Sequence, residues 1–104
     1  MTGIDFIAEE RQRQIDEEGW TINHDVRHRT GQLVEAAIAY AAQSINIEVR
    51  RVTIGTLRHI YSDLWPWDKT FDKRKKHAPL RCLVIAGALL AAEIDRRIQQ
   101  GEGQ

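Results

Sequence analysis

The stretch from Pro79 to Gly101 reads PLRCLVIAGALLAAEIDRRIQQG. Proline suits the first turn of a helix, where its missing N–H has no helical partner, and glycine commonly follows the last turn. Arg96 and Arg97 lie near the carboxyl end, where cations offset the helix dipole. Apolar residues recur every three or four positions, which predicts a long helix with one apolar face. The predicted stripe is Leu80, Leu83, Val84, Gly87, Leu90, Ala91, Ile94 and Ile98.

Gly87 is unusual in the middle of this helix, because glycine there costs about 1 kcal/mol relative to alanine. We therefore expect another helix to approach closely at this point. The alanine-rich stretch Gln32–Ser44 is the expected neighbour.

Two further helices are predicted upstream. The first covers about residues 4–18 and is followed by Gly19, a natural residue to end a helix. The second covers about residues 32–44, with Thr30 as its N-cap. Its expected buried residues are Leu33, Ala36 or Ala37, Tyr40 and Ala41.

Residues 45–64 fit two patterns. Ile45, Ile47 and Val49 alternate as in a strand, and so do Val52 and Ile54. Leu57, Ile60, Tyr61 and Leu64 instead have helical spacing. We favour a loop followed by a short helix, and an irregular basic loop over residues 65–78. The predicted fold is all-α: one domain over residues 1–104, a small bundle of three main helices with long ordered loops and a frayed tail at 101–104. An oligomer is expected to complete the core.

The composition narrows the range of possible functions. The 104 residues are 42% apolar and 29% charged, with zero formal net charge. This argues against a duplex nucleic-acid binder, which needs surplus cations to displace counterions. The single cysteine, Cys82, excludes an internal disulfide and is expected to be a buried structural thiol. No apolar signal segment or membrane-length run occurs, so we expect a cytoplasmic protein without a membrane partner.

The loops carry the most distinctive residues. Proline cannot sit inside a helix, so Trp65-Pro66-Trp67 must form a bend, where indole rings either stack on a ligand base or close the core. Guanidinium groups match phosphate, and a basic run follows this bend. The predicted ligand-binding set combines Trp20, Trp65, Trp67 and Phe71 for stacking with Arg11, Lys69, Lys73 and Arg74 for phosphate.

His24 and Asp25 complete this predicted ligand-binding set, by ordering the loop or binding a ribose. The alternatives are plain loop hydrogen bonds, or a metal shared with His28. We expect no catalytic residue, no bound metal and no cofactor.

Carboxylates suggest a second function. Acids on several helices could hold Mg²⁺ for pyrophosphate chemistry, because hard oxygen ligands suit that ion. Solvated helix faces with intrahelical ion pairs are the simpler interpretation. The acids concerned are Glu9, Glu10, Glu35, Glu93 and Asp95.

Three blocks of sequence together resemble a family of small proteins from bacteriophages and prophages. The blocks are Glu10–Ile15 with Glu18-Gly19-Trp20-Thr21 and His24-Asp25; Gly31-Gln32-Leu33 with Ala36-Ala37 and Tyr40-Ala41; and Trp65-Pro66-Trp67 with Leu83-Val84, Ala86-Gly87-Ala88-Leu89 and Ala92-Glu93-Ile94-Asp95-Arg96. The chain departs from the family pattern after Trp67, where Thr70-Phe71-Asp72-Lys73 replaces Trp-Trp-Lys-Pro.

The resemblance implies a phage setting, in which small proteins counter host defence. It favours a homo-oligomeric binding protein that sequesters a nucleotide-derived immune signal. Two other functions stay open: an Mg²⁺-dependent nucleotide pyrophosphohydrolase, and a protein–protein inhibitor of a host factor whose tryptophans anchor the interface.

Overall fold

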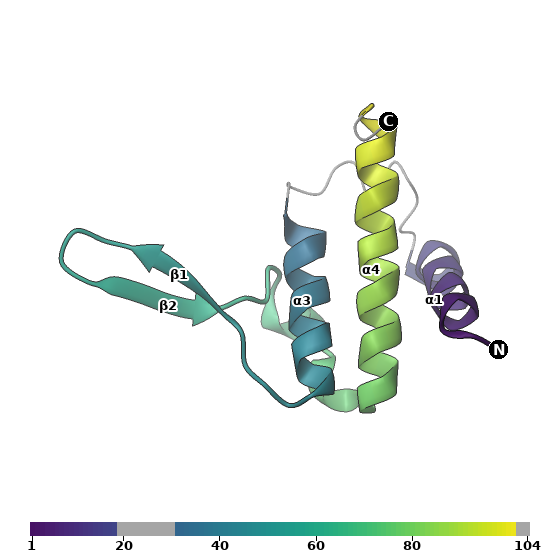
Figure 1. Ribbon diagram of the computed structural model, residues 1–104, viewed down its shortest axis with the longest axis horizontal. Coiled ribbons are helices and arrows are strands. Elements are labelled where there is room, and N and C mark those ends of the chain that lie inside the picture. Colours follow the sequence, from purple (N-terminus) through teal and green to yellow (C-terminus); the bar gives the residue numbers. More distant parts are fainter. Residues whose placement is uncertain (19–30, 102–104) are drawn as a thin grey trace.

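The computed structural model describes residues 1–18 and 31–101, and it is mostly helical (Figure 1). The helix α4 lies between α3 and α1, and a two-stranded antiparallel sheet extends from the α3 side. Residues 65–78, predicted to be irregular, contain two short 3-10 turns. The elements are α1 (Gly3–Glu18), α3 (Gln32–Ser44), β1 (Arg50–Ile54), β2 (His59–Asp63), η1 (Lys69–Phe71), η2 (Arg74–Lys76) and α4 (Pro79–Gln99).

The core forms where α3 packs along α4. Both helices contribute small side chains, which let their backbones approach, and larger residues fill the space between. The three predicted helices are confirmed, and so is the burial of Leu33, Ala36, Ala37 and Tyr40 on α3, whereas Ala41 is only partly buried. The core residues are Leu33, Ala36, Ala37 and Tyr40 from α3, with Cys82, Ile85, Ala86, Leu89 and Ala92 from α4.

Cys82 is buried, as predicted. Its thiol contacts the carbonyl oxygen of Arg74 at 3.5 Å, which links α4 to η2. Burial raises the pKa of this thiol, so it stays protonated and serves packing.

The predicted apolar stripe of α4 is largely wrong as a core face. Five of its large residues are exposed, and α4 instead buries a neighbouring face that includes Glu93 and Arg96. The alanine-rich packing against α3 places this other side of α4 in the core. Its buried charges are tolerated because Arg96 donates a hydrogen bond to Glu93 at 2.7 Å. We call the exposed residues the α4 stripe: Leu80, Leu83, Leu90, Ile94 and Ile98.

A helix does approach Gly87 closely, but it is α1 and not α3. A Cβ at Gly87 would lie 2.5 Å from Cδ1 of Ile7. Because Gly87 has no side chain, Ile7 of α1 can pack closely against α4 at this point. The expected neighbour was wrong because α3 packs on the other side of α4 (Figure 1).

Residues 50–63 form a β-hairpin, which corrects both the all-α prediction and the predicted short helix. In the antiparallel register Val52 faces Tyr61, and Gly55 donates its N–H to the carbonyl of Arg58 at 3.0 Å. A Cβ on Gly55 would lie 2.6 Å from that carbonyl oxygen. The β-branched alternation and a glycine that allows the turn outweigh the helical spacing of Leu57 and Ile60.

We call residues 50–63 the arm. It projects away from the bundle (Figure 1), and every residue of both strands is exposed. An ion pair between Arg51 and Glu35 links it to α3.

Candidate ligand-binding site

The tryptophan bend closes one end of the core. Trp65 and Trp67 are half-buried against the α3–α4 core and meet edge to face, with centroids 5.4 Å apart. Tyr40 packs on the other side of Trp65 at 5.8 Å. The indole N–H of Trp65 donates to the carbonyl of Asp68 at 3.1 Å. The described contacts of both rings are therefore those of a packed core.

Beside this bend, Arg74 bridges two acidic residues, Asp72 and Asp63. Its guanidinium lies 5.3 Å from the Trp65 ring centroid and donates to Asp72 at 2.6 Å and Asp63 at 3.1 Å. These contacts tie η2 to the end of the arm. The hydrogen bond to Asp72 is the chief reason that the pKa of Arg74 rises above its ordinary value. The hydrogen bond from the backbone N–H of Trp65, followed by that from Arg74, lowers the pKa of Asp63, although burial acts to raise it.

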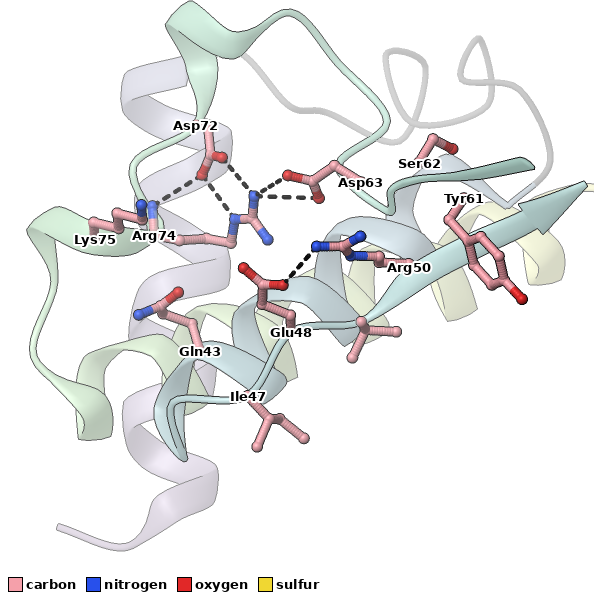
Figure 2. Close-up of a pocket in the computed structure, with 11 residues that line it drawn as sticks. Gln43, Ile47, Glu48, Arg50, Tyr61, Ser62, Asp63, Asp72, Arg74 and Lys75 are labelled. Carbon is pink, nitrogen blue, oxygen red and sulfur yellow. Dashed lines mark hydrogen bonds and ion pairs between the residues drawn. The ribbon is translucent and has the colours of Figure 1, made fainter. Parts of the chain in front are cut away.

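A cavity of about 280 Å³ lies between the end of α3, the base of the arm and η2. Figure 2 shows the guanidinium groups of Arg50 and Arg74 pointing toward the same space from different elements. Glu48 accepts from Arg50 at 3.0 Å, whereas the ring of Tyr61 points away. The charged residues of the pocket are Glu48, Arg50, Asp63, Asp72, Arg74 and Lys75.

The other predicted loop residues lie at the surface nearby. Lys69 is in η1 and Lys73 precedes η2; both are exposed. Phe71 is 67% exposed, so its ring is open to a ligand or to solvent. Together with Lys75 and Lys76, these lysines give the loop a cationic surface beside the pocket.

Arg11 lies elsewhere. It is buried on α1 and pairs with Asp95 of α4 at 3.4 Å. It does not line the pocket, so the structure does not join it with Arg74. Trp20, His24 and Asp25, predicted for the same site, lie outside the described residues.

Next to Arg11, Glu10 and Gln14 form a buried polar cluster. Glu10 is 1% exposed and accepts from Arg13 at 2.7 Å, from Gln14 at 3.2 Å and from Arg81. Burial alone raises the pKa of Glu10, but the hydrogen bond and charge of Arg13 and the charge of Arg81 outweigh it, so the pKa is lowered. The Oε1 atom of Gln14 has no hydrogen-bond partner among the described residues.

Most of the other acids considered as Mg²⁺ ligands form ion pairs with arginines. Glu35 pairs with Arg51, and Glu93 accepts from both Arg96 and Arg97. The hydrogen bond from Arg96, followed by that from Arg97, lowers the pKa of Glu93 against the effect of burial. Within residues 1–18 and 31–101 no group of three or more potential ligands could hold a metal ion.

Sequence reasoning missed most of the pocket. Arg50 and Lys75 were not singled out, although the pairing of Arg50 with Asp63 across the strands could have placed Arg50 near the basic loop. That signal depends on recognising the hairpin, because only the antiparallel register brings residue 50 beside residue 63.

No helix of the part that the structure describes is long and apolar enough to cross a membrane. The chain matches no protein-family model, no curated protein and no solved structure. Its own residues and their geometry therefore carry the functional argument.

Proposed function

We propose that this protein sequesters a small, anionic, nucleotide-derived molecule, with a phosphate held between Arg50 and Arg74. The observation that carries the proposal is the convergence of these two guanidinium groups on one cavity (Figure 2). Guanidinium N–H groups match phosphate oxygens in geometry and charge.

Several features support a small ligand. The cavity of about 280 Å³ is close to the size expected of a small-molecule pocket. Lys75 also lines it and adds a positive charge, which helps to lower the pKa of Asp72 in the same pocket. Exposed Lys69 and Lys73 add long-range attraction for anions. The resemblance to phage proteins supports an anti-defence role, in which the nucleotide is a host immune signal.

Arg50 is the best residue for a test, because Arg74 also holds Asp63 and Asp72 and its loss would disturb the fold. We expect Arg50→Gln to weaken binding about tenfold to hundredfold, as for the loss of a hydrogen bond to a charged group. The matched control is Arg58→Gln in the turn of the arm, outside the pocket. Native mass spectrometry with a panel of cyclic and linear nucleotides, including ADP-ribose derivatives, identifies the ligand, and calorimetry measures the loss.

Each outcome has a clear meaning. An intact nucleotide retained by the wild type and lost by Arg50→Gln supports sequestration at this pocket. Equal binding by both variants contradicts the site, and no retained nucleotide contradicts the function. A cleaved nucleotide replaces sequestration with hydrolysis.

A further inference from the structure

The arm and the loop that follows it carry a strong positive charge. Residues 50–76 contain eight Lys and Arg residues against three Asp residues, which is a net charge of +5. The rest of the chain carries −5, because the formal net charge of the whole is zero. We call residues 50–76 the basic segment. Such a division of charge within one chain indicates a partner of opposite charge.

The fold also separates the two charges in space. Helix α1 carries six Asp and Glu residues against two arginines, and it lies on the far side of α4 from the arm (Figure 1). The loop with η2 lies beside the base of the arm, since Arg50 and Lys75 line the same pocket. Zero net charge argues against a duplex nucleic-acid binder only where the charge is evenly spread. That argument therefore does not hold for the side of the molecule that carries the basic segment.

The cations of the basic segment lie largely at the surface. Arg50, Arg51 and Arg74 pair with acids. The other five are exposed, one in the turn of the arm and four in or beside the two 3-10 turns. They are Arg58, Lys69, Lys73, Lys75 and Lys76. Exposed cations of this kind bind a polyanion by displacing its condensed counterions.

The arm has the form of an element that enters a nucleic-acid groove. It is a two-stranded antiparallel ribbon that projects from the bundle, and both strands are exposed (Figure 1). The major groove of duplex DNA is about 12 Å wide and admits such a ribbon. Arg58 lies at the outer end of the arm, and Arg50 and Arg51 lie at its base. Positive charge therefore stands at both ends of the ribbon, as a groove bordered by phosphates requires.

The outer end of the arm is also apolar, which narrows the choice of polyanion. Ile54 is 77% exposed and Leu57 is 97% exposed. Apolar side chains contact the C5-methyl group of thymine, which lies in the major groove. A lipid bilayer fits less well, because Arg58 follows Leu57 directly and would enter the hydrocarbon layer with it. Duplex RNA also fits less well, since its major groove is too deep and narrow for side chains to read.

We propose that the arm enters the major groove of duplex DNA, while the lysines of residues 69–76 contact the phosphates beside the groove. In this arrangement Arg58 binds a phosphate at the outer end of the arm, and Leu57 contacts thymine methyl groups. Both residues lie outside the pocket. The proposal therefore does not depend on nucleotide sequestration, and the two functions are tested separately.

The first test measures binding to a fluorescently labelled DNA duplex of roughly 20 base pairs, about two helical turns, by anisotropy over a series of salt concentrations. We expect wild-type binding to weaken steeply as salt rises. Arg58→Gln should reduce the slope of log affinity against log salt by about 1 and weaken binding about tenfold at roughly 0.1 M salt, because one phosphate contact is lost. Arg97→Gln is the matched control. It removes the same charge from α4, where Arg96 still pairs with Glu93, and it should leave the slope unchanged.

The second test places the arm in the major groove. A duplex with deoxyuridine in place of thymidine lacks the C5-methyl groups and keeps every phosphate. We expect the wild type to bind this duplex about fourfold more weakly, which is the effect of one methyl group no longer buried. Leu57→Ala should bind both duplexes equally. Circular dichroism checks that each variant is folded.

Several results would overturn the proposal. They are a wild type that does not bind the duplex at low salt, equal losses in Arg58→Gln and Arg97→Gln, and equal wild-type binding to the two duplexes. Tighter binding to single-stranded DNA or to duplex RNA also contradicts entry into the major groove. Binding to phosphatidylserine vesicles without binding to the duplex would assign the basic segment to a lipid surface instead.

Discussion

Glu10 illustrates how single residues hold α1 to α4. Its buried carboxylate accepts hydrogen bonds from Arg13, Gln14 and Arg81. We expect Glu10→Gln to lower the free energy of unfolding by about 2 kcal/mol, because two arginines lose a charged acceptor. Urea denaturation measures the change. Glu9→Gln, one position away and exposed, should change stability by no more than about 0.5 kcal/mol, and equal losses in the two variants would contradict this role.

The same residue predicts a pH dependence. The folded pKa of Glu10 lies below its ordinary value of 4.5, so its contribution is present above that pH and is lost as the pH falls through the folded pKa. Acidification should therefore destabilise the wild type more than Glu10→Gln. Urea denaturation of both proteins at a series of pH values measures the difference, and parallel losses of stability would show that Glu10 is not the group responsible.

At the scale of the elements, the packing of α1 on α4 depends on the absence of a side chain at Gly87. Alanine at Gly87 gains about 1 kcal/mol of helix propensity but meets Ile7, and such overpacking costs about 1–3 kcal/mol. We expect Gly87→Ala to destabilise the wild type by about 1 kcal/mol. In an Ile7→Ala background the clash is removed, and the same change should stabilise by about 1 kcal/mol. Urea denaturation of the four proteins gives the coupling, and identical effects in both backgrounds would refute the contact.

For the whole molecule, the outer part of the arm should contribute little to the stability of the bundle, because both strands are exposed. Replacing residues 53–60 by Asn-Gly keeps the facing pair Val52 and Tyr61 and favours a tight hairpin turn. This shortened arm loses Ile54, Leu57 and Ile60. We expect its Tm to be close to that of the wild type at the same protein concentration, because residues 53–60 are all exposed and surface changes of this kind have small effects on stability. A lower Tm at every concentration would mean that the arm stabilises its own bundle.

The candidate site was predictable only in part. Arg74 was singled out from the basic run, and it does line the pocket. Arg50 was missed because its neighbourhood exists only once the hairpin register is set. Trp65 and Trp67 were expected at a bend, and the bend was confirmed; the choice between core and ligand depended on contacts with Tyr40 and Arg74, which are distant in sequence.

The sequence by itself determined where the helices run. Periodicity, Pro79 and the glycines act within one or two turns, so α1, α3 and α4 follow from local chemistry. Only the tertiary structure decided which side of α4 is buried, which helix rests on Gly87, and that residues 50–63 pair as a hairpin. Each of these outcomes depends on how the surfaces of different elements fit together. The free energy of that packing depends on the shape of each surface and on its partner more than on the apolar character of each stretch.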